Sequence, residues 1–375
     1  MDRRLFGKIA LGITAFGSTI SSAFSQTVKK AKRPKRINKD ISKIIDPNLA
    51  NFSPDTAQEQ MKVIQAKRFF YNEKAEGVCT SLLFFADIHL VTEHSTKIRK
   101  FYEKYKKFID DPIHLGDTVG SIYREPFTTW DAFPRALNVI GNHDTYSKKM
   151  GNSDMSDKRK YDIYFKNYNK EWKVVLPENA EEEGKCYWHK DYNGNVRLIG
   201  VDCMRYTDSK QLVWFKEILA DAIQKNLKVM IATHIPPNCD KLLECNFTSL
   251  DNQAWQTKLS GSSDFVKAVD EFISAGGTFV CWMCGHLHYD SIMYTKDTKN
   301  KQLVIAMECA TQYSDHSDMQ HIRETATETC WQLVAVESVS NVLKIARFGN
   351  CYDHYLRRKD TFCYDFKNHK IIWSS

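Results

Sequence analysis

Apolar runs along this chain alternate with segments of helical periodicity, and most of the runs end in polar residues. The run from Ser81 to Ala86 is almost continuously apolar, which is typical of a strand buried on both faces. Residues 95–109 carry apolar side chains at helical spacing and predict an amphipathic helix. Short apolar runs at 113–115 and 136–140 predict two more strands. This succession predicts an α/β sheet with ligands gathered beyond the carboxyl ends of its strands.

The second half of the chain continues the alternation. An Asn-Gly pair at 193–194 predicts a hairpin turn, and Gly276 predicts the end of a helix. The predicted elements are a helix at 157–168, a hairpin of 186–191 and 196–201, a helix capped by Thr207 or Asp208 and ending near 225, a strand at 228–232, a helix at 265–275, a strand at 278–284 and hairpins at about 291–309 and 331–348. We expect the last two hairpins to form a second sheet packed against the first.

The ends of the chain differ from the body. Basic residues precede an apolar segment at 9–20, and the small residues Ala23 and Ser25 follow it. This pattern predicts a cleaved secretory signal, too short to span a bilayer, and hence an exported protein, periplasmic or extracellular, without a transmembrane anchor after cleavage. An uncleaved interfacial helix is the alternative. The expected organisation is a signal peptide at 1–25, a basic linker at 26–52, a leader helix at 53–78, the main domain at 79–350 and an aromatic C-terminal extension at 351–375 packed on that domain.

Charge is concentrated at the N-terminus. The chain carries a formal net charge of +7, but residues 1–40 hold ten of its 53 basic residues and two of its 46 acidic ones. The rest of the chain is therefore close to neutral and lacks the basic surface of a nucleic-acid-binding domain. We interpret the basic tract at 29–39 as a solvated linker, with attachment to an anionic surface as the alternative.

The eleven cysteines are an odd number, so at least one is unpaired if the others form disulfides. Cys281 and Cys284 have the C-x-x-C spacing of a zinc or redox motif. Both lie in an apolar run, and no second pair stands at zinc-knuckle distance, so we interpret them as buried core thiols. Cys239 and Cys245, which bracket a short loop, are the best disulfide candidates.

Residue types that bind metals stand at the ends of the predicted strands. They are Asp87 and His89, Asp117, Asn142, His143 and Asp144, His234, and finally His286 and His288. Imidazole, carboxylate and amide groups without a thiolate suit Mn²⁺, Fe or Zn²⁺ better than Mg²⁺ or Ca²⁺. The sequence therefore predicts one metal site assembled from several loops. His114 lies inside a predicted strand, which indicates a core or supporting role.

These motifs resemble the calcineurin-like metallophosphoesterase superfamily in identity, order and approximate spacing, and the signal suggests an exported bacterial-type member. The motifs are Asp-x-His at 87–89, Gly-Asp at 116–117, Gly-Asn-His-Asp at 141–144, His234 and Gly-His-x-His at 285–288. The resemblance implies an α/β fold, a four-layer α/β/β/α sandwich of two mixed β-sheets flanked by helices. Gly120 departs from it, since many members carry an acidic residue there. His89 argues against the purple acid phosphatases, which have a tyrosine ligand at that place.

The resemblance also implies two divalent metal ions and a role for each motif residue. It places Asp87, His89 and His288 around one ion and Asn142, His234 and His286 around the other, with Asp117 bridging them. His143 is left as the general acid, and Asp144 would orient its imidazole and raise its pKa. We expect extended backbone at 286–288, in which His286 and His288 point the same way.

The expected function is that of a metal-dependent phosphoesterase. It would hydrolyse a small-molecule phosphate mono- or diester by attack of a hydroxide that bridges the two ions. Nothing in the sequence separates monoester from diester substrates. The alternative is a non-catalytic exported binding protein that retains the fold, against which the intact ligand set argues.

Overall fold

The computed structural model describes residues 79–89, 97–118, 135–145, 156–166, 172–237, 239–241, 261–288, 290–310, 329–349 and 361–374. They all belong to one compact unit, 47–375. The predicted signal peptide, basic linker and leader helix lie outside the described residues. Within those residues, no helix combines the length and the apolar character needed to cross a membrane.

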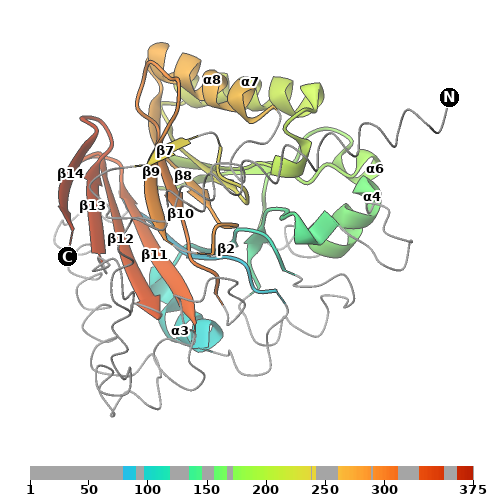
Figure 1. Ribbon diagram of the computed structural model, residues 1–375, viewed down its shortest axis with the longest axis horizontal. Coiled ribbons are helices and arrows are strands. Elements are labelled where there is room, and N and C mark those ends of the chain that lie inside the picture. Colours follow the sequence, from blue (N-terminus) through green and yellow to red (C-terminus); the bar gives the residue numbers. More distant parts are fainter. Residues whose placement is uncertain are drawn as a thin grey trace, which may run out of the picture. The chain divides into compact units, whose positions relative to one another are not determined.

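The first sheet is built around the apolar run at the start of the described residues. Strand β1 (Cys79–Phe85) lies between β11 (Cys330–Glu337), which is antiparallel to it, and β2 (Asp111–His114), which is parallel. The order of the seven strands is β14-β13-β12-β11-β1-β2-β3. The outer strands are β3 (Leu137–Asn138), β12 (Val342–Gly349), β13 (Thr361–Asp365) and β14 (Lys370–Ser374). Residues 361–374 thus form a hairpin within this sheet (Figure 1).

The second sheet also has seven strands, in the order β4-β5-β6-β8-β10-β9-β7. Its strands are β4 (Trp188–Tyr192), β5 (Val196–Gly200), β6 (Lys228–Thr233), β7 (Cys239–Lys241), β8 (Thr278–Cys284), β9 (Ser291–Thr295) and β10 (Leu303–Ala306). Strands β5, β6, β8 and β10 are parallel. The expectation that the two late hairpins form a sheet of their own is wrong. Hairpin β9–β10 extends the second sheet through β8, whereas β11–β12 joins the first sheet through β1.

Three apolar clusters define four layers. The cluster between the sheets joins side chains from both, such as Phe84 of β1 and Met230 of β6. On the outer face of the second sheet pack α7 (Ser209–Gln224) and α8 (Ser262–Ser274), with Phe215 and Phe265 in contact. On the outer face of the first sheet packs α3 (Lys97–Tyr105). This confirms the α/β/β/α sandwich of two mixed sheets.

Most predicted elements are confirmed, with changes at their ends. Asp208 caps α7 through the N–H of Lys210, whereas α8 begins three residues before its predicted start. The predicted five-residue strand at 136–140 is reduced to the two residues of β3. The remaining short elements are the 3₁₀ turns η3 (Lys106–Phe108), η5 (His143–Thr145) and η8 (Cys203–Arg205), helices α4 (Asp157–Lys160) and α6 (Ala180–Glu183), and the π-helical turn η7 (Tyr161–Phe165).

The two cysteines of the C-x-x-C motif lie on opposite faces of β8. Cys281 belongs to the cluster between the sheets, and Cys284 to the cluster under α7 and α8. Both are buried, and burial raises the pKa of the Cys281 thiol far above its usual range. The interpretation as core thiols is confirmed. Of the predicted disulfide pair, Cys245 lies outside the described residues.

Candidate metal centre

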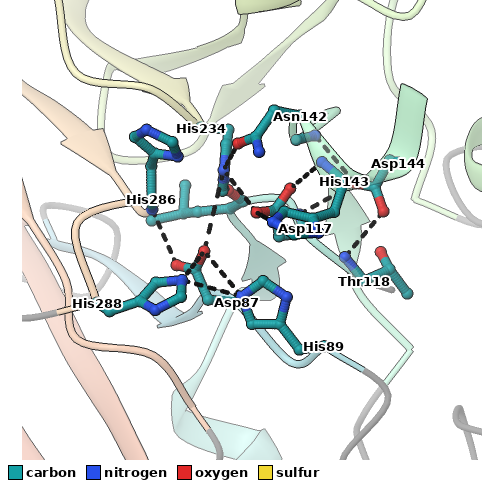
Figure 2. Close-up of polar contacts among 12 residues, drawn as sticks. Asp87, His89, Asp117, Thr118, Asn142, His143, Asp144, His234, His286 and His288 are labelled. Carbon is teal, nitrogen blue, oxygen red and sulfur yellow. Dashed lines mark hydrogen bonds and ion pairs between the residues drawn. The ribbon is translucent and has the colours of Figure 1, made fainter. Parts of the chain in front are cut away.

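Three of the predicted ligands meet beyond the end of β1. The Asp87 Oδ1 atom lies 3.4 Å from His288 Nε2 and 3.7 Å from His89 Nε2. The two imidazole nitrogens are 2.9 Å apart, and all three residues are buried. Figure 2 shows the three side chains pointing toward one another. Although they come from positions about 200 residues apart, they form one ligand group.

A second group lies beside the first. The Asp117 Oδ2 atom is 3.1 Å from His234 Nε2, which is 3.0 Å from Asn142 Oδ1. His286 completes the group, because its ligand atom and those of Asp117 and His234 all lie within 4.8 Å of one another. The groups adjoin, since His234 Nε2 is 3.9 Å from Asp87 Oδ1. The fold thus brings all seven predicted ligands together.

The electrostatics of these groups fit cations. Asp87 Oδ1 and Asp117 Oδ2 are buried, and the imidazole nitrogens of His288 and His234 lie 3.4 Å and 3.1 Å from them. Buried carboxylates are costly unless a positive charge lies close. Burial lowers the pKa of His89 and of His286 to about 4, which leaves both rings in the neutral form that binds metals.

His234 differs from these two histidines. Burial lowers its pKa, but the carboxylates of Asp117 and Asp87 outweigh burial and raise the pKa to about 9. Its Nδ1 atom lies 2.7 Å from the carbonyl oxygen of Leu115, which fixes the ring and leaves Nε2 facing the carboxylates. The sequence offered no signal for this backbone partner. A metal ion at Nε2 would replace the proton that the neighbouring carboxylates otherwise stabilise on this nitrogen.

Five of the seven predicted ligands have left-handed backbone. Their φ angles are 54° at Asp87, 50° at His89, 55° at Asp117, 69° at His286 and 57° at His288. Non-glycine residues adopt this region at a cost of about 1 kcal/mol or more each. The prediction that extended backbone aims His286 and His288 the same way is therefore wrong, and the two rings belong to different ligand groups.

Two glycines allow the backbone to approach the ligands. A Cβ atom at Gly141 would lie 2.1 Å from Asp117 Oδ1, and one at Gly285 would lie 2.6 Å from Asp87 Oδ2. Next to the second glycine, the N–H of His286 donates to Asp87 Oδ2 at 2.9 Å. Gly141 and Gly285 therefore leave room for the carboxylates of Asp117 and Asp87. This explains why each of the two motifs begins with glycine.

His143 lies at the open side of the site. It begins η5, its N–H donates to Asp117 Oδ1 at 2.8 Å, and its Nε2 is 3.8 Å from Asp117 Oδ2. The ring stands edge-on to that of His89, with centroids 4.9 Å apart. Its side chain is 32% exposed, whereas those of Asp117 and His234 are almost completely buried. A partly exposed imidazole at this place can contact a bound molecule.

Asp144 holds two of the ligand loops together. Its buried carboxylate accepts hydrogen bonds from the N–H groups of Asp117 at 3.0 Å, Thr118 at 2.9 Å and Gly141 at 2.9 Å. Burial and the nearby Asp117 carboxylate raise its pKa to about 7, although the amide donors act in the opposite direction. The predicted orientation of the His143 ring by Asp144 stays a prediction.

His114 lies buried within the first sheet. It is fully buried, and its Nδ1 atom lies 2.7 Å from Asn138 Oδ1 on the neighbouring strand. Burial lowers its pKa to about 4, so that the ring is neutral. The predicted core or supporting role is confirmed.

The comparison with protein families agrees with this geometry. The calcineurin-like phosphoesterase model matches residues 80–290, more than half of the chain. The chain therefore belongs to the calcineurin-like phosphoesterase family, whose members act on phosphoester bonds. No curated protein matches the chain.

Several solved structures resemble the chain at low identity. A dimetal phosphatase from Danio rerio is 12% identical, covering 74% of this chain and 99% of its own, with a TM-score of 0.44. GAP50, the anchor in the inner membrane complex of Plasmodium, is 10% identical over 80% of this chain and 88% of its own, with a TM-score of 0.43. A phosphopantetheinyl hydrolase from Mycobacterium tuberculosis is 13% identical over 62% of this chain and 91% of its own, with a TM-score of 0.31.

Proposed function

We propose that this chain hydrolyses a small-molecule phosphate mono- or diester with two divalent ions, of which Mn²⁺, Fe and Zn²⁺ suit the ligands best. The observation that carries the proposal is the meeting of two adjoining groups of imidazole and carboxylate ligands around the buried side chains of Asp87 and Asp117. When bound, such ions supply a nucleophile at neutral pH and neutralise charge on the phosphoryl group.

The protein's own residues divide the remaining work. Asp87, His89 and His288 would hold one ion and Asn142, His234 and His286 the other, while Asp117, which contacts both groups, would bridge them. His143 would donate its proton to the leaving-group oxygen, because its ring is partly exposed and adjoins both groups. Asp144 fixes the loops that carry Asp117 and Asn142. His143 and the metal ligands therefore keep fixed positions relative to one another.

A metal-reconstituted assay tests this proposal. The protein would be stripped of metal, reloaded with Mn²⁺, Fe²⁺ or Zn²⁺, and assayed on a nitrophenyl phosphate monoester and on the corresponding bis-ester. We expect two bound ions by elemental analysis and turnover of at least one ester. The Asp117→Asn variant should lose both metal and turnover. Asp202→Asn, which alters another fully buried carboxylate, should keep both.

The outcomes separate the two functional hypotheses. Two bound ions without turnover of either ester would favour a non-catalytic binding protein over a hydrolase. Failure to bind metal would contradict both the hydrolase hypothesis and the hypothesis of a metal-binding protein. Turnover that persists in Asp117→Asn would place the chemistry elsewhere in the chain.

We further propose that the protein is exported with cleavage near residue 25, on the strength of the N-terminal pattern. N-terminal sequencing of the protein recovered from the extracytoplasmic fraction tests this. A protein that begins at Met1, or that stays with the cytoplasm, would contradict it.

A further inference from the structure

One buried ion cluster outside the ligand set ties the loop after β8 to the first sheet. It consists of Arg347 and Gln332 on β12 and β11, Asp290 before β9 and Glu308 after β10, and we call it the Arg347 cluster. The guanidinium pairs with both carboxylates, through Nε to Asp290 and through Nη2 to Glu308. Arg347 is only 3% exposed. A buried arginine between two carboxylates from the opposite sheet is a specific link between the layers.

Asp290 is the centre of this cluster. Its Oδ1 atom accepts from the N–H of Glu308 at 3.0 Å and from Gln332 Nε2 at 2.9 Å. Gln332 and Arg347 are direct partners across the β11–β12 pair. The segment that follows the last ligand is thereby attached to the end of β10 and to two strands of the first sheet.

The position of Asp290 matters because it follows His288 by two residues. The start of the ligand loop has its own anchors, since the N–H of Gly285 donates to the His234 carbonyl oxygen and that of His286 to Asp87 Oδ2, both at 2.9 Å. The end of the loop is held by Asp290. His288 has left-handed backbone, with φ of 57°, and such a conformation persists only where the surroundings fix it.

The positive charge of Arg347 contributes to this anchor. One ligand atom each from Asp290, Glu308 and Cys330 lie within 4.8 Å of one another. Two carboxylates this close repel each other strongly away from water. The guanidinium pairs with both carboxylates, so an apolar side chain in its place would remove both ion pairs and weaken the attachment of Asp290 at the end of the loop.

We propose that Arg347 is a positioning residue for the metal-binding histidine His288, acting through Asp290. The inference rests on the proposed two-metal site. It concerns the ion held by Asp87, His89 and His288, and it assigns no contact between Arg347 and substrate.

Stepwise metal titration of the full chain tests the inference. The variant His288→Asn first identifies the metal-binding step that depends on His288. In Arg347→Met, the affinity of this His288-dependent step should fall at least about tenfold, whereas the affinity of the other step should change by less than about threefold. Arg347→Lys keeps the charge and should recover part of the loss. The matched control is Arg197→Met, which removes another fully buried arginine that pairs with Asp191 and Asp221 away from the site.

The possible results are distinguishable. Wild-type affinities in Arg347→Met would overturn the inference and leave the proposed function standing. Equal weakening of both steps in the Arg347 and Arg197 variants would show a general effect of stability and would also overturn it. Should Arg347→Met fail to fold, Arg347→Gln decides, since it removes the charge but keeps a polar side chain, and an unchanged His288-dependent step in that variant would overturn the inference. A wild-type chain that binds no metal would refute the proposed function itself, and the inference with it.

Discussion

Replacing Asp144 with asparagine tests how the ligand loops are held. The wild-type carboxylate accepts three backbone hydrogen bonds, two at Oδ2 from Asp117 and Gly141 and one at Oδ1 from Thr118. An asparagine has the same shape, but only one of its two terminal atoms accepts. If its oxygen takes the two bonds, its NH₂ group faces the N–H of Thr118, and one buried donor is left unpaired.

The magnitude follows from these three bonds. An unpaired buried N–H costs about 1–3 kcal/mol. The other two bonds add no loss of charge assistance, because the raised pKa of the carboxyl means that its negative charge is unfavourable in the fold. We therefore expect Asp144→Asn to lower the free energy of unfolding by no more than about 1–3 kcal/mol. Metal affinity should fall as well, because the loops that carry Asp117 and Asn142 separate.

Urea unfolding followed by circular dichroism at pH 8 measures the loss, since this pH lies above the pKa of about 7 of the carboxyl. Asp202→Asn is the control, because Asp202 is equally buried and accepts one hydrogen bond among the described residues, from the N–H of Met204. Wild-type stability and metal content in Asp144→Asn, together with reduced turnover and an altered pH profile, would refute the reasoning. That result would favour the role of Asp144 in orienting His143.

Three further predictions concern separate features. His143→Ala should keep both metals but lose turnover by about 10²–10⁴-fold, and full activity in this variant would remove the histidine from the mechanism. Gly285→Ala should weaken metal binding, because its Cβ would meet Asp87 Oδ2 at 2.6 Å; unchanged affinity by metal titration would contradict this. Burial, and then Arg197, lower the pKa of His189 to about 4, whereas it is about 6.5 in an unfolded chain. The unfolded state thus binds more protons as the pH falls from 6.5 to 5, and the wild type should lose up to about 2 kcal/mol of stability that His189→Gln retains. Parallel pH dependence of urea unfolding in the two proteins would contradict this.

The layers of the fold were predictable because burial on both faces leaves a clear mark on the sequence. The runs that became β1, β6 and β8 are apolar along most of their length, and each is flanked by a parallel strand on at least one side. Which strands pair was not predictable in the same way. Hairpin β11–β12 joins β1 through long-range contacts, and nothing in its local pattern distinguishes the two sheets.

The identity of the site residues was predictable, but their conformation was not. Residue types at the ends of strands predicted that Asp87, Asp117 and His234 meet, and they do. The left-handed backbone at His286 and His288 was missed, because it is imposed by tertiary contacts and opposes the local preference of the residues. The contacts of Asp144 were missed for a related reason, since its partners are backbone amides, which every residue carries.

The pairing of β1 with β11 has a consequence for how the chain reaches this structure. Cys79 aligns with Glu337, and β1 is a central strand of the first sheet. The sheet therefore cannot close until more than 250 further residues have been synthesised, and pairing over such a distance is slow because the entropy of a long loop is lost before the contacts form. During synthesis the apolar run at 81–86 remains without its antiparallel neighbour, exposed to chaperones and to aggregation. A chain exported during synthesis would cross the membrane unfolded. Its metal centre would then be completed only after export.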